Sequence, residues 1–122
     1  MDNNKKILLI EDDQNTRDLY FGILRTQGYT IDMAQDGKEG LSKAENGTYN
    51  LILLDIMMPK VDGLEALSIL KKQDSNRKVA LFSNLSSTDI VDQAMNIGAD
   101  EFIMKSDTDP DAFLVKINKL VN

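Results

Sequence analysis

The sequence of 122 residues contains no cysteine and no histidine. Without cysteine there is neither a disulfide framework nor a thiolate metal site, which suits a cytoplasmic protein. Without histidine, imidazole acid–base catalysis and His-ligated zinc are both excluded. Carboxylates, hydroxyls and lysine must therefore carry any chemistry that this chain performs.

Long hydrophobic runs are missing as well. The polar start of the chain leads into only four apolar residues, Ile7 to Ile10, too few for a signal peptide or a bilayer span. We therefore expect no membrane association. A formal net charge of −6 repels phosphate backbones, so direct nucleic-acid binding is not expected either. An inorganic cation is the more favourable partner for such a chain.

The length fits one domain spanning residues 1–122, and 42% of the residues are hydrophobic. A chain of this size buries roughly two-thirds of the surface that its unfolded form exposes. No linker, internal repeat or low-complexity tract interrupts it. We expect a single core organised by strands and helices in alternation.

Uninterrupted apolar runs predict strands that are buried on both faces, because a strand with one solvated face would alternate with polar residues. The longest such runs, together with two shorter ones, predict five strands. They cover residues 7–10, 29–34, 51–55, 79–83 and 102–104.

Apolar residues at helical spacing predict a helix after each strand. The helices are expected over residues 15–26, over 37–46, from 63 onward, from a cap within residues 86–89 to a stop before Gly98, and over 110–121. Aspartates at positions 13, 36, 62 and 109 are the expected caps at helix starts, and glycines 28 and 98 the expected stops. Leu19 and Met95 fall in apolar stripes, whereas Lys71-Lys72 is expected to lie on a solvated face.

Strands that alternate with helices predict an α/β fold with a parallel sheet, because parallel neighbours need crossover connections. We favour a doubly wound, flavodoxin-like, five-stranded sheet in the order 2-1-3-4-5, with helices on both faces. This order makes the first and third strands adjacent where the winding direction reverses. Ligands of such folds bind there, outside the carboxyl ends of the strands.

Polar residues end, or directly follow, four of the predicted strands at that edge. They are Glu11 and Asp12, then Asp55, Ser83 and Lys105. Crowded carboxylates repel one another, and a hard cation with oxygen ligands relieves the repulsion. A magnesium ion between Asp12 and Asp55 would also attract a phosphoryl group, and Asp55 could then attack phosphorus to form an acyl phosphate. The Lys105 ammonium and the Ser83 hydroxyl would stabilise the new charge.

These residues stand in an order that resembles the receiver domain of two-component response regulators over essentially the whole chain. The matching stretches are Glu11-Asp12, Asp55-Ile56-Met57-Met58-Pro59 with Asp62-Gly63, Ser83, and Gly98-Ala99-Asp100 leading to Phe102 and Lys105. The resemblance implies a signalling domain that is not an enzyme in its own right. It further implies a partner that is a sensor histidine kinase or a phosphotransfer protein.

By the same resemblance, Asp55 is the expected phospho-acceptor. Glu11 and Asp12 are the expected Mg²⁺-site acids, and the backbone carbonyl of Met57 is a further expected ligand. Ser83 and Phe102 are the expected switch pair. Phosphorylation would change a partner-binding surface formed by the fourth helix, fifth strand and fifth helix, and could bring two copies together as a homodimer.

Three positions depart from the family pattern. Ser106 follows the lysine where a proline is usual, Asn84 stands where a small residue is usual, and Asn50 replaces a frequent acid. Asn84 and Ser106 favour an alternative function, a receiver-like interaction module that works without phosphorylation. A flavodoxin-like cofactor domain is a third reading of the topology, but acids at positions 11–13 would repel a flavin phosphate.

Overall fold

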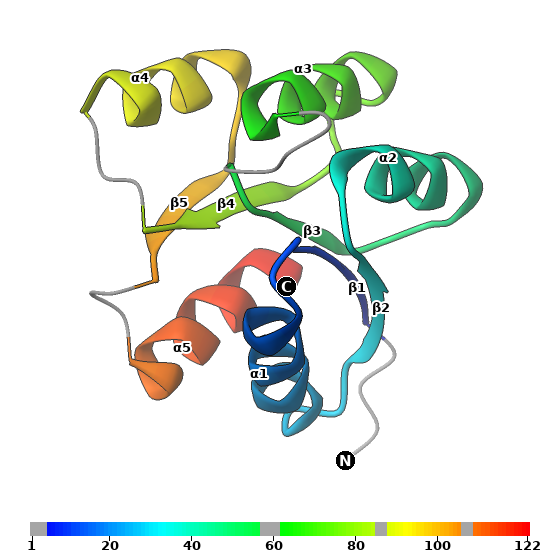
Figure 1. Cartoon of the computed structure of the whole chain (residues 1–122), viewed down its shortest axis with the longest axis vertical. Coiled ribbons are helices and arrows are strands. Elements are labelled where there is room, and N and C mark those ends of the chain that lie inside the picture. The colour runs from blue at the N-terminus through cyan, green and yellow to red at the C-terminus, as the bar shows by residue number, and fades with distance from the viewer. Residues whose placement is uncertain (1–4, 57–61, 85–87, 106–108) are drawn as a thin grey trace.

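The computed structural model describes residues 5–56, 62–84, 88–105 and 109–122, and its strands and helices alternate along the chain (Figure 1). The strands are β1 (Lys6–Ile10), β2 (Thr30–Ala34), β3 (Leu51–Leu54), β4 (Val79–Ser83) and β5 (Glu101–Met104). The helices are α1 (Gln14–Arg25), α2 (Gly37–Asn46), α3 (Gly63–Gln73), α4 (Thr88–Ile97) and α5 (Pro110–Val121). The predicted elements are thus confirmed, with bounds that shift by one or two residues.

The strands form one parallel sheet in the predicted order, β2-β1-β3-β4-β5. Helices α2, α3 and α4 cover one face of the sheet, and α1 and α5 cover the other (Figure 1). In the β1–β3 pair, Ile10 lies opposite Leu54, so both strands end at the same level. The residues that follow them, Glu11 and Asp55, therefore meet at one edge of the sheet.

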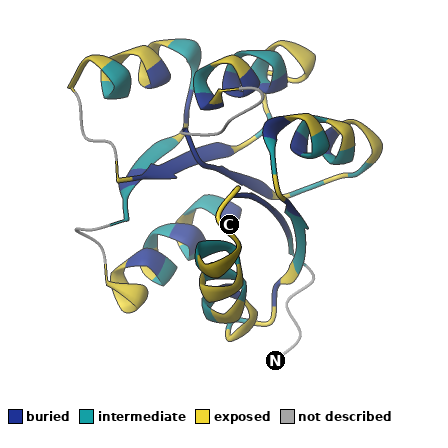
Figure 2. Ribbon diagram, viewed as in Figure 1, coloured by how far each residue is buried: buried dark blue, intermediate teal, exposed yellow. Residues whose placement is uncertain are grey.

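Apolar side chains fill both sides of the sheet, which explains the uninterrupted apolar runs. Alternate residues of β1 go to opposite clusters, with Leu8 and Ile10 facing α2, α3 and α4, and Ile7 and Leu9 facing α1 and α5. The central strands β1, β3 and β4 are buried apart from half-buried Lys6, while the outer faces of the helices are exposed (Figure 2). A sheet covered on both faces is open to solvent at its strand ends and along its partly exposed outer strands, β2 and β5.

Side chains cap the helices as predicted. The carboxylates of four aspartates accept hydrogen bonds from backbone N–H groups in the first turns of α1, α2, α3 and α5, and these aspartates are Asp13, Asp36, Asp62 and Asp109. Gly28 and Gly98 follow α1 and α4 with positive φ angles of 81° and 122°, a conformation that costs a glycine little.

The helix faces differ from a simple interpretation of the sequence at three residues, and the solvated face expected at Lys71 was wrong. The Leu19 and Met95 side chains are 59% and 46% exposed, because each stands at the solvent edge of its helix's apolar stripe. Lys71 is not on a solvated face, since its ammonium pairs with Asp100 at 2.9 Å. Its neighbour Lys72 is exposed, as expected.

None of the helices in the described part of the chain is both long and apolar enough to cross a membrane.

Candidate functional site

The strand ends place Glu11, Asp12 and Asp55 beside one another. Asp55 follows β3, and its backbone N–H donates to the Ile10 carbonyl oxygen at 3.1 Å, which continues the β1–β3 ladder by one bond. The Glu11 N–H likewise donates to the Ala34 carbonyl at 3.0 Å. Both acids are thus fixed by the backbone of neighbouring strands, whatever their side chains contact.

The three carboxylates could hold one cation, because each offers an oxygen and these oxygens lie within 4.8 Å of one another. Glu11 and Asp55 are buried, with exposures of 1% and 5%, whereas Asp12 is exposed. An all-oxygen set that is open to water on one side suits Mg²⁺, which keeps several of its own waters. Histidine and cysteine ligands, which other metals prefer, do not occur in the chain.

Lys105 brings the balancing charge to this cluster. Its ammonium forms a close ion pair with Glu11, although Glu11 and Lys105 lie near opposite ends of the chain. The same ammonium lies 3.5 Å from Oδ2 of Asp55. The Lys105 N–H donates to the Ser83 carbonyl at 3.0 Å, which ties the lysine to the end of β4. The ammonium thus faces the carboxylate predicted to take the phosphoryl group.

Charge crowding is visible at Asp12. Partial loss of contact with water raises the pKa of its carboxyl above the ordinary value, and the hydrogen bond with Glu11 and the negative charge of Glu11 raise the pKa further. The raised pKa means that ionised Asp12 is disfavoured in the fold without a counter-ion. A divalent cation between these acids would remove that penalty.

Sequence reasoning missed Arg17, which supports the loop that carries the acids. Its guanidinium donates to the backbone carbonyls of Glu11 at 2.8 Å and of Asp12 at 3.4 Å. The Asp13 N–H donates to a Glu11 carboxylate oxygen at 3.1 Å, and Asp13 itself caps α1 as expected. The available signal was the position of Arg17 one helical turn after the Asp13 cap, which returns a side chain to the same loop.

Gly63 explains why Asp62-Gly63 belongs to the motif. A Cβ at Gly63 would lie 2.3 Å from the Ile56 Cα and 2.7 Å from the Asp55 carbonyl oxygen, distances that no side chain tolerates. The Gly63 N–H donates to the Ile56 carbonyl at 2.8 Å. The start of α3 therefore packs directly on the backbone of Asp55, and only glycine permits that approach.

The remaining predicted site residues have different surroundings. Ser83 ends β4 and is 2% exposed, and Phe102 of β5 is half-buried against the cluster that faces α2, α3 and α4. Ser83 lies two residues after Leu81 of that same cluster, so the strand pleat directs Ser83 to the face that Phe102 occupies. Met57 and Ser106 lie outside the described residues. The roles assigned to all these residues remain predictions.

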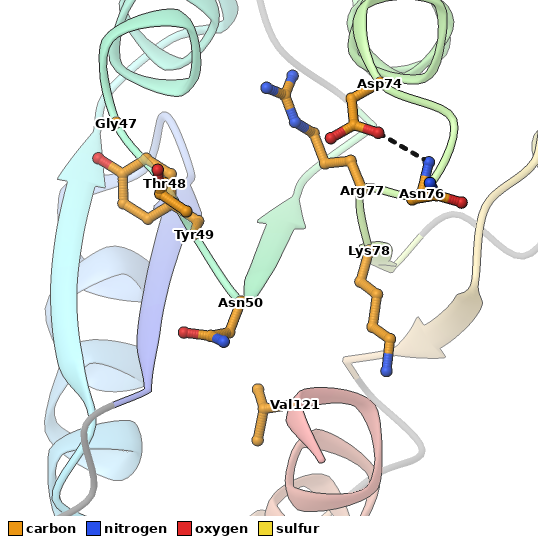
Figure 3. Close-up of a pocket in the computed structure, with 9 residues that line it drawn as sticks. All are labelled: Gly47, Thr48, Tyr49, Asn50, Asp74, Asn76, Arg77, Lys78 and Val121. Atoms are coloured by element: carbon orange, nitrogen blue, oxygen red, sulfur yellow. Dashed lines mark hydrogen bonds between the residues drawn. The ribbon is translucent and has the colours of Figure 1, made fainter.

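A pocket of about 400 Å³ lies elsewhere, at the amino ends of the strands (Figure 3). Its cations, Arg77 and Lys78, point in opposite directions and bind carbonyl oxygens near helix ends. Arg77 donates to the Ala44 carbonyl of α2 at 3.4 Å, and Lys78 to the Leu120 carbonyl of α5 at 2.8 Å. Cations at helix C-termini stabilise the helices. We therefore assign this pocket no part in the candidate site.

A family model described as the response regulator receiver domain matches residues 7–118. Among curated proteins, the response regulator ArlR of Staphylococcus saprophyticus is 36% identical over 100 residues, which cover 82% of this chain and 45% of that protein. The chain thus spans less than half the length of this relative.

Solved structures give the same picture. A CheY-like response regulator receiver domain protein from Methanospirillum hungatei has a TM-score of 0.92 and 34% identity, covering 98% of this chain and 94% of that chain. The response regulator TrrA from Thermotoga maritima, solved in complex with Mg(2+)-BeF, has a TM-score of 0.86 and 36% identity. That similarity covers 95% of this chain and 98% of the TrrA chain.

Proposed function

Because the chain belongs to the family of response regulator receiver domains, we propose that residues 1–122 form one such domain that takes a phosphoryl group on Asp55 in a Mg²⁺-dependent reaction. One observation carries the proposal. Asp55 is a buried carboxylate that shares a cation-sized space with Glu11 and Asp12 and lies 3.5 Å from the Lys105 ammonium. A carboxylate that could act as nucleophile, three carboxylates that could hold a cation and a positive charge thus lie together, which supports the proposal.

The donor is a phosphohistidine of a sensor kinase or phosphotransfer protein, or a small acyl phosphate. An Asp55 carboxylate oxygen forms the new bond to phosphorus, and the bond from phosphorus to the donor breaks with its electron pair leaving on the donor. Burial of Asp55 and the β1–β3 backbone bond hold the nucleophile in one place. Such positioning supplies most of what phosphoryl transfer needs from a protein.

Glu11, Asp12 and Asp55 would hold the Mg²⁺ ion, with the Met57 carbonyl as a further ligand. When bound, the ion neutralises charge on the transferring phosphoryl oxygens. The similar response regulator TrrA, at 36% identity, was solved in complex with Mg(2+)-BeF, which supports Mg²⁺ as the metal for this chain. Lys105 then stabilises the phosphoryl group, and the Ser83 hydroxyl donates to one of its oxygens.

The output would be a change in the surface formed by α4, β5 and α5. Ser83 ends β4, which pairs with the β3 strand that precedes Asp55, and Phe102 lies on the neighbouring strand β5. Movement of the serine toward a phosphoryl oxygen would free space for the Phe102 ring. A downstream protein or a second copy of the chain would bind the changed surface. The domain would act in the cytoplasm, where its kinase partner works.

The test is phosphorylation by acetyl phosphate with Mg²⁺, read by intact-protein mass spectrometry. We expect one phosphate adduct on the wild type, none on Asp55→Asn, and none for the wild type after chelation of the metal. Asp13→Asn is the matched control, because it changes a cap at the same edge and asparagine still caps a helix. An unmodified wild type, or equal labelling of wild type and Asp55→Asn, would favour the phosphorylation-independent module.

A further inference from the structure

The Lys105 ammonium has an aromatic neighbour that the proposed mechanism does not use. It lies 4.6 Å from the centroid of the Phe82 ring, over the ring face. Its other neighbours are the carboxylates of Glu11 and Asp55. The lysine side chain is 13% exposed, so the contact with the ring is largely shielded from water. A cation over a ring is attracted by the ring quadrupole, more strongly as water is removed.

The Phe82 ring is rigidly held beneath the lysine. It is 0% exposed, and Tyr20 of α1 packs edge-on against it with ring centroids 5.1 Å apart at 72°. Tyr20 also packs edge-on against Phe113 of α5 at 5.0 Å. Three aromatic rings from α1, β4 and α5 thus form an aromatic platform, in which the Phe82 ring faces the ammonium.

The Lys105 side chain has a second space available to it. A pocket of about 220 Å³ opens between α1 and α5 directly beside the lysine, with Leu19, Tyr20, Ile23, Pro110 and Phe113 as its other lining residues. The methylenes of Lys105 could lie along this apolar space with the ammonium turned to solvent, away from Asp55. Something must therefore hold the lysine at the carboxylates.

The carboxylates cannot hold it throughout the reaction. If Mg²⁺ binds to Glu11 and Asp55, it neutralises the same carboxylates that hold the ammonium, so the attraction between lysine and acids weakens. The ring cannot bind Mg²⁺ in this site and keeps its attraction. It is the contact of Lys105 that metal binding leaves unchanged.

We propose that Phe82 is a positioning residue, whose ring face keeps the Lys105 ammonium directed at the Asp55 phosphoryl group when the metal engages Glu11. This inference rests on the proposed function. A leucine at position 82 would fill the core, but it would offer the ammonium no electrostatic attraction. The aromatic ring therefore serves the reaction as well as the packing.

The geometry is tested first by NMR, without any phosphorylation. Protons above an aromatic ring are shifted upfield, so the ε-methylene protons of ¹³C-labelled Lys105, assigned with Lys105→Arg, should be upfield of those of the other lysines. We expect the shift in the free protein, its persistence with Mg²⁺ and beryllofluoride, and its loss in Phe82→Leu. An ordinary shift in the free protein, or loss of the upfield shift on adding Mg²⁺ and beryllofluoride, would overturn the proposal.

The effect on the reaction is tested by replacing Phe82 with 3,4,5-trifluorophenylalanine, which keeps the ring's shape and weakens its quadrupole. We expect phosphorylation by acetyl phosphate to slow roughly fivefold, the scale of a partly buried cation–π contact. Affinity for Mg²⁺, measured in the absence of phosphodonor, should stay within twofold, roughly the size of experimental differences. The same replacement at Phe113 is the matched control, because that ring contacts Tyr20 in the same aromatic platform. It should leave the rate unchanged, because the Lys105 ammonium lies over the Phe82 ring.

The outcomes separate this inference from the proposed function. Labelling of the wild type with equal rates for the fluorinated and unmodified proteins, or with the same slowing at positions 82 and 113, overturns the role of Phe82 alone. A wild type that takes no phosphate overturns the proposed function, and the inference with it.

Discussion

The two open edges of the sheet treat charge in opposite ways. At the amino edge, where the strands begin, charged side chains have partners within the fold. Asp100 pairs with Lys71, and Arg77 and Lys78 donate to helix carbonyls. Lys6 at the start of β1 pairs with Asp32 of β2, which also accepts a hydrogen bond from Tyr49. At the carboxyl edge, where the strands end, three carboxylates gather around the Lys105 ammonium. The amino edge is electrostatically satisfied, and the carboxyl edge carries an excess of negative charge.

This difference separates a structural edge from a functional one. The amino edge has a pocket of about 400 Å³, yet its cations already bind carbonyl oxygens at the ends of α2 and α5 (Figure 3). The carboxyl edge places acids that repel one another on backbone that cannot move apart. Unrelieved repulsion at fixed positions is a better guide to ligand binding here than cavity volume.

The largest effect on stability is expected from Asp100→Ala at the amino edge. Oδ2 of Asp100 accepts from the buried Val79 N–H at 2.8 Å and pairs with Lys71 at 2.9 Å. Loss of both contacts should lower the free energy of unfolding by about 2–3 kcal/mol, as for hydrogen bonds to charged groups. Urea unfolding would measure it.

Two further variants sharpen that result. Asp100→Asn keeps an acceptor for Val79 and should lose less than Asp100→Ala. Asp92→Ala removes an exposed acid from α4 and should change the unfolding free energy by less than about 0.5 kcal/mol. Equal losses for Asp100→Ala and Asp92→Ala would contradict a structural role for the amino edge.

Tyr49→Phe is expected to cost less, about 1 kcal/mol, since it deletes one hydrogen bond from the tyrosine hydroxyl to Asp32 at 2.7 Å. That bond is the main reason why the pKa of Asp32 lies below its ordinary value of 3.8. A lowered carboxyl pKa contributes stability that is present above pH 3.8 and is lost as pH falls through the folded-state pKa.

The cost of Tyr49→Phe should therefore be full at neutral pH and shrink as the solution is acidified below 3.8. Urea unfolding at several pH values would follow it. Tyr20→Phe leaves the Asp32 contact intact and serves as the control. A cost that stays constant on acidification would show that the Asp32 interaction is not its source.

At the carboxyl edge the sign should reverse. Asp12→Asn is expected to stabilise the metal-free protein, because the pKa of Asp12 is raised and its ionised form is disfavoured. A raised pKa contributes stability that is present below 3.8 and is lost as pH rises through the folded-state pKa, so at pH 7 the acid is a liability. Since Asp12 is exposed, screening should hold the gain below about 1 kcal/mol.

Thermal unfolding at pH 7 with and without Mg²⁺ would measure both halves of this prediction. Magnesium should stabilise the wild type and should stabilise Asp12→Asn much less. Asp13→Asn should behave as the wild type does. A metal-free Asp12→Asn protein that is less stable than the wild type, with an undiminished response to Mg²⁺, would break the comparison between the edges.

The smallest effect is expected from Asn84→Ala. The Asn84 side chain is exposed directly after Ser83, where it adds bulk beside the approach of a donor. Removing it should speed phosphorylation by acetyl phosphate roughly twofold, equivalent to about 0.4 kcal/mol. Asn76→Ala changes an exposed amide at the amino edge and should leave the rate unchanged. A slower Asn84→Ala reaction would mean that the amide assists the donor.

Whether the sequence predicts a feature depends on whether that feature is local or results from tertiary packing. The apolar runs determined the strands, because Leu51 to Leu54 can only be a strand buried on both faces, and capping aspartates marked the starts of α1, α2, α3 and α5. Alternation of strands and helices then indicated the sheet order. That order in turn predicted Glu11, Asp12, Asp55 and Lys105 at one edge of the sheet.

Tertiary structure alone decided which groups contact one another. Sequence spacing does not reveal that Lys71 crosses to Asp100, that Arg17 holds the Glu11 and Asp12 carbonyls, or that the Phe82 ring lies under Lys105. Nor could it tell that Leu19 turns outward while Tyr20 packs inward. Propensity, periodicity and capping act between near neighbours in the chain, whereas these contacts join side chains brought together by packing, so only the assembled layers fix them.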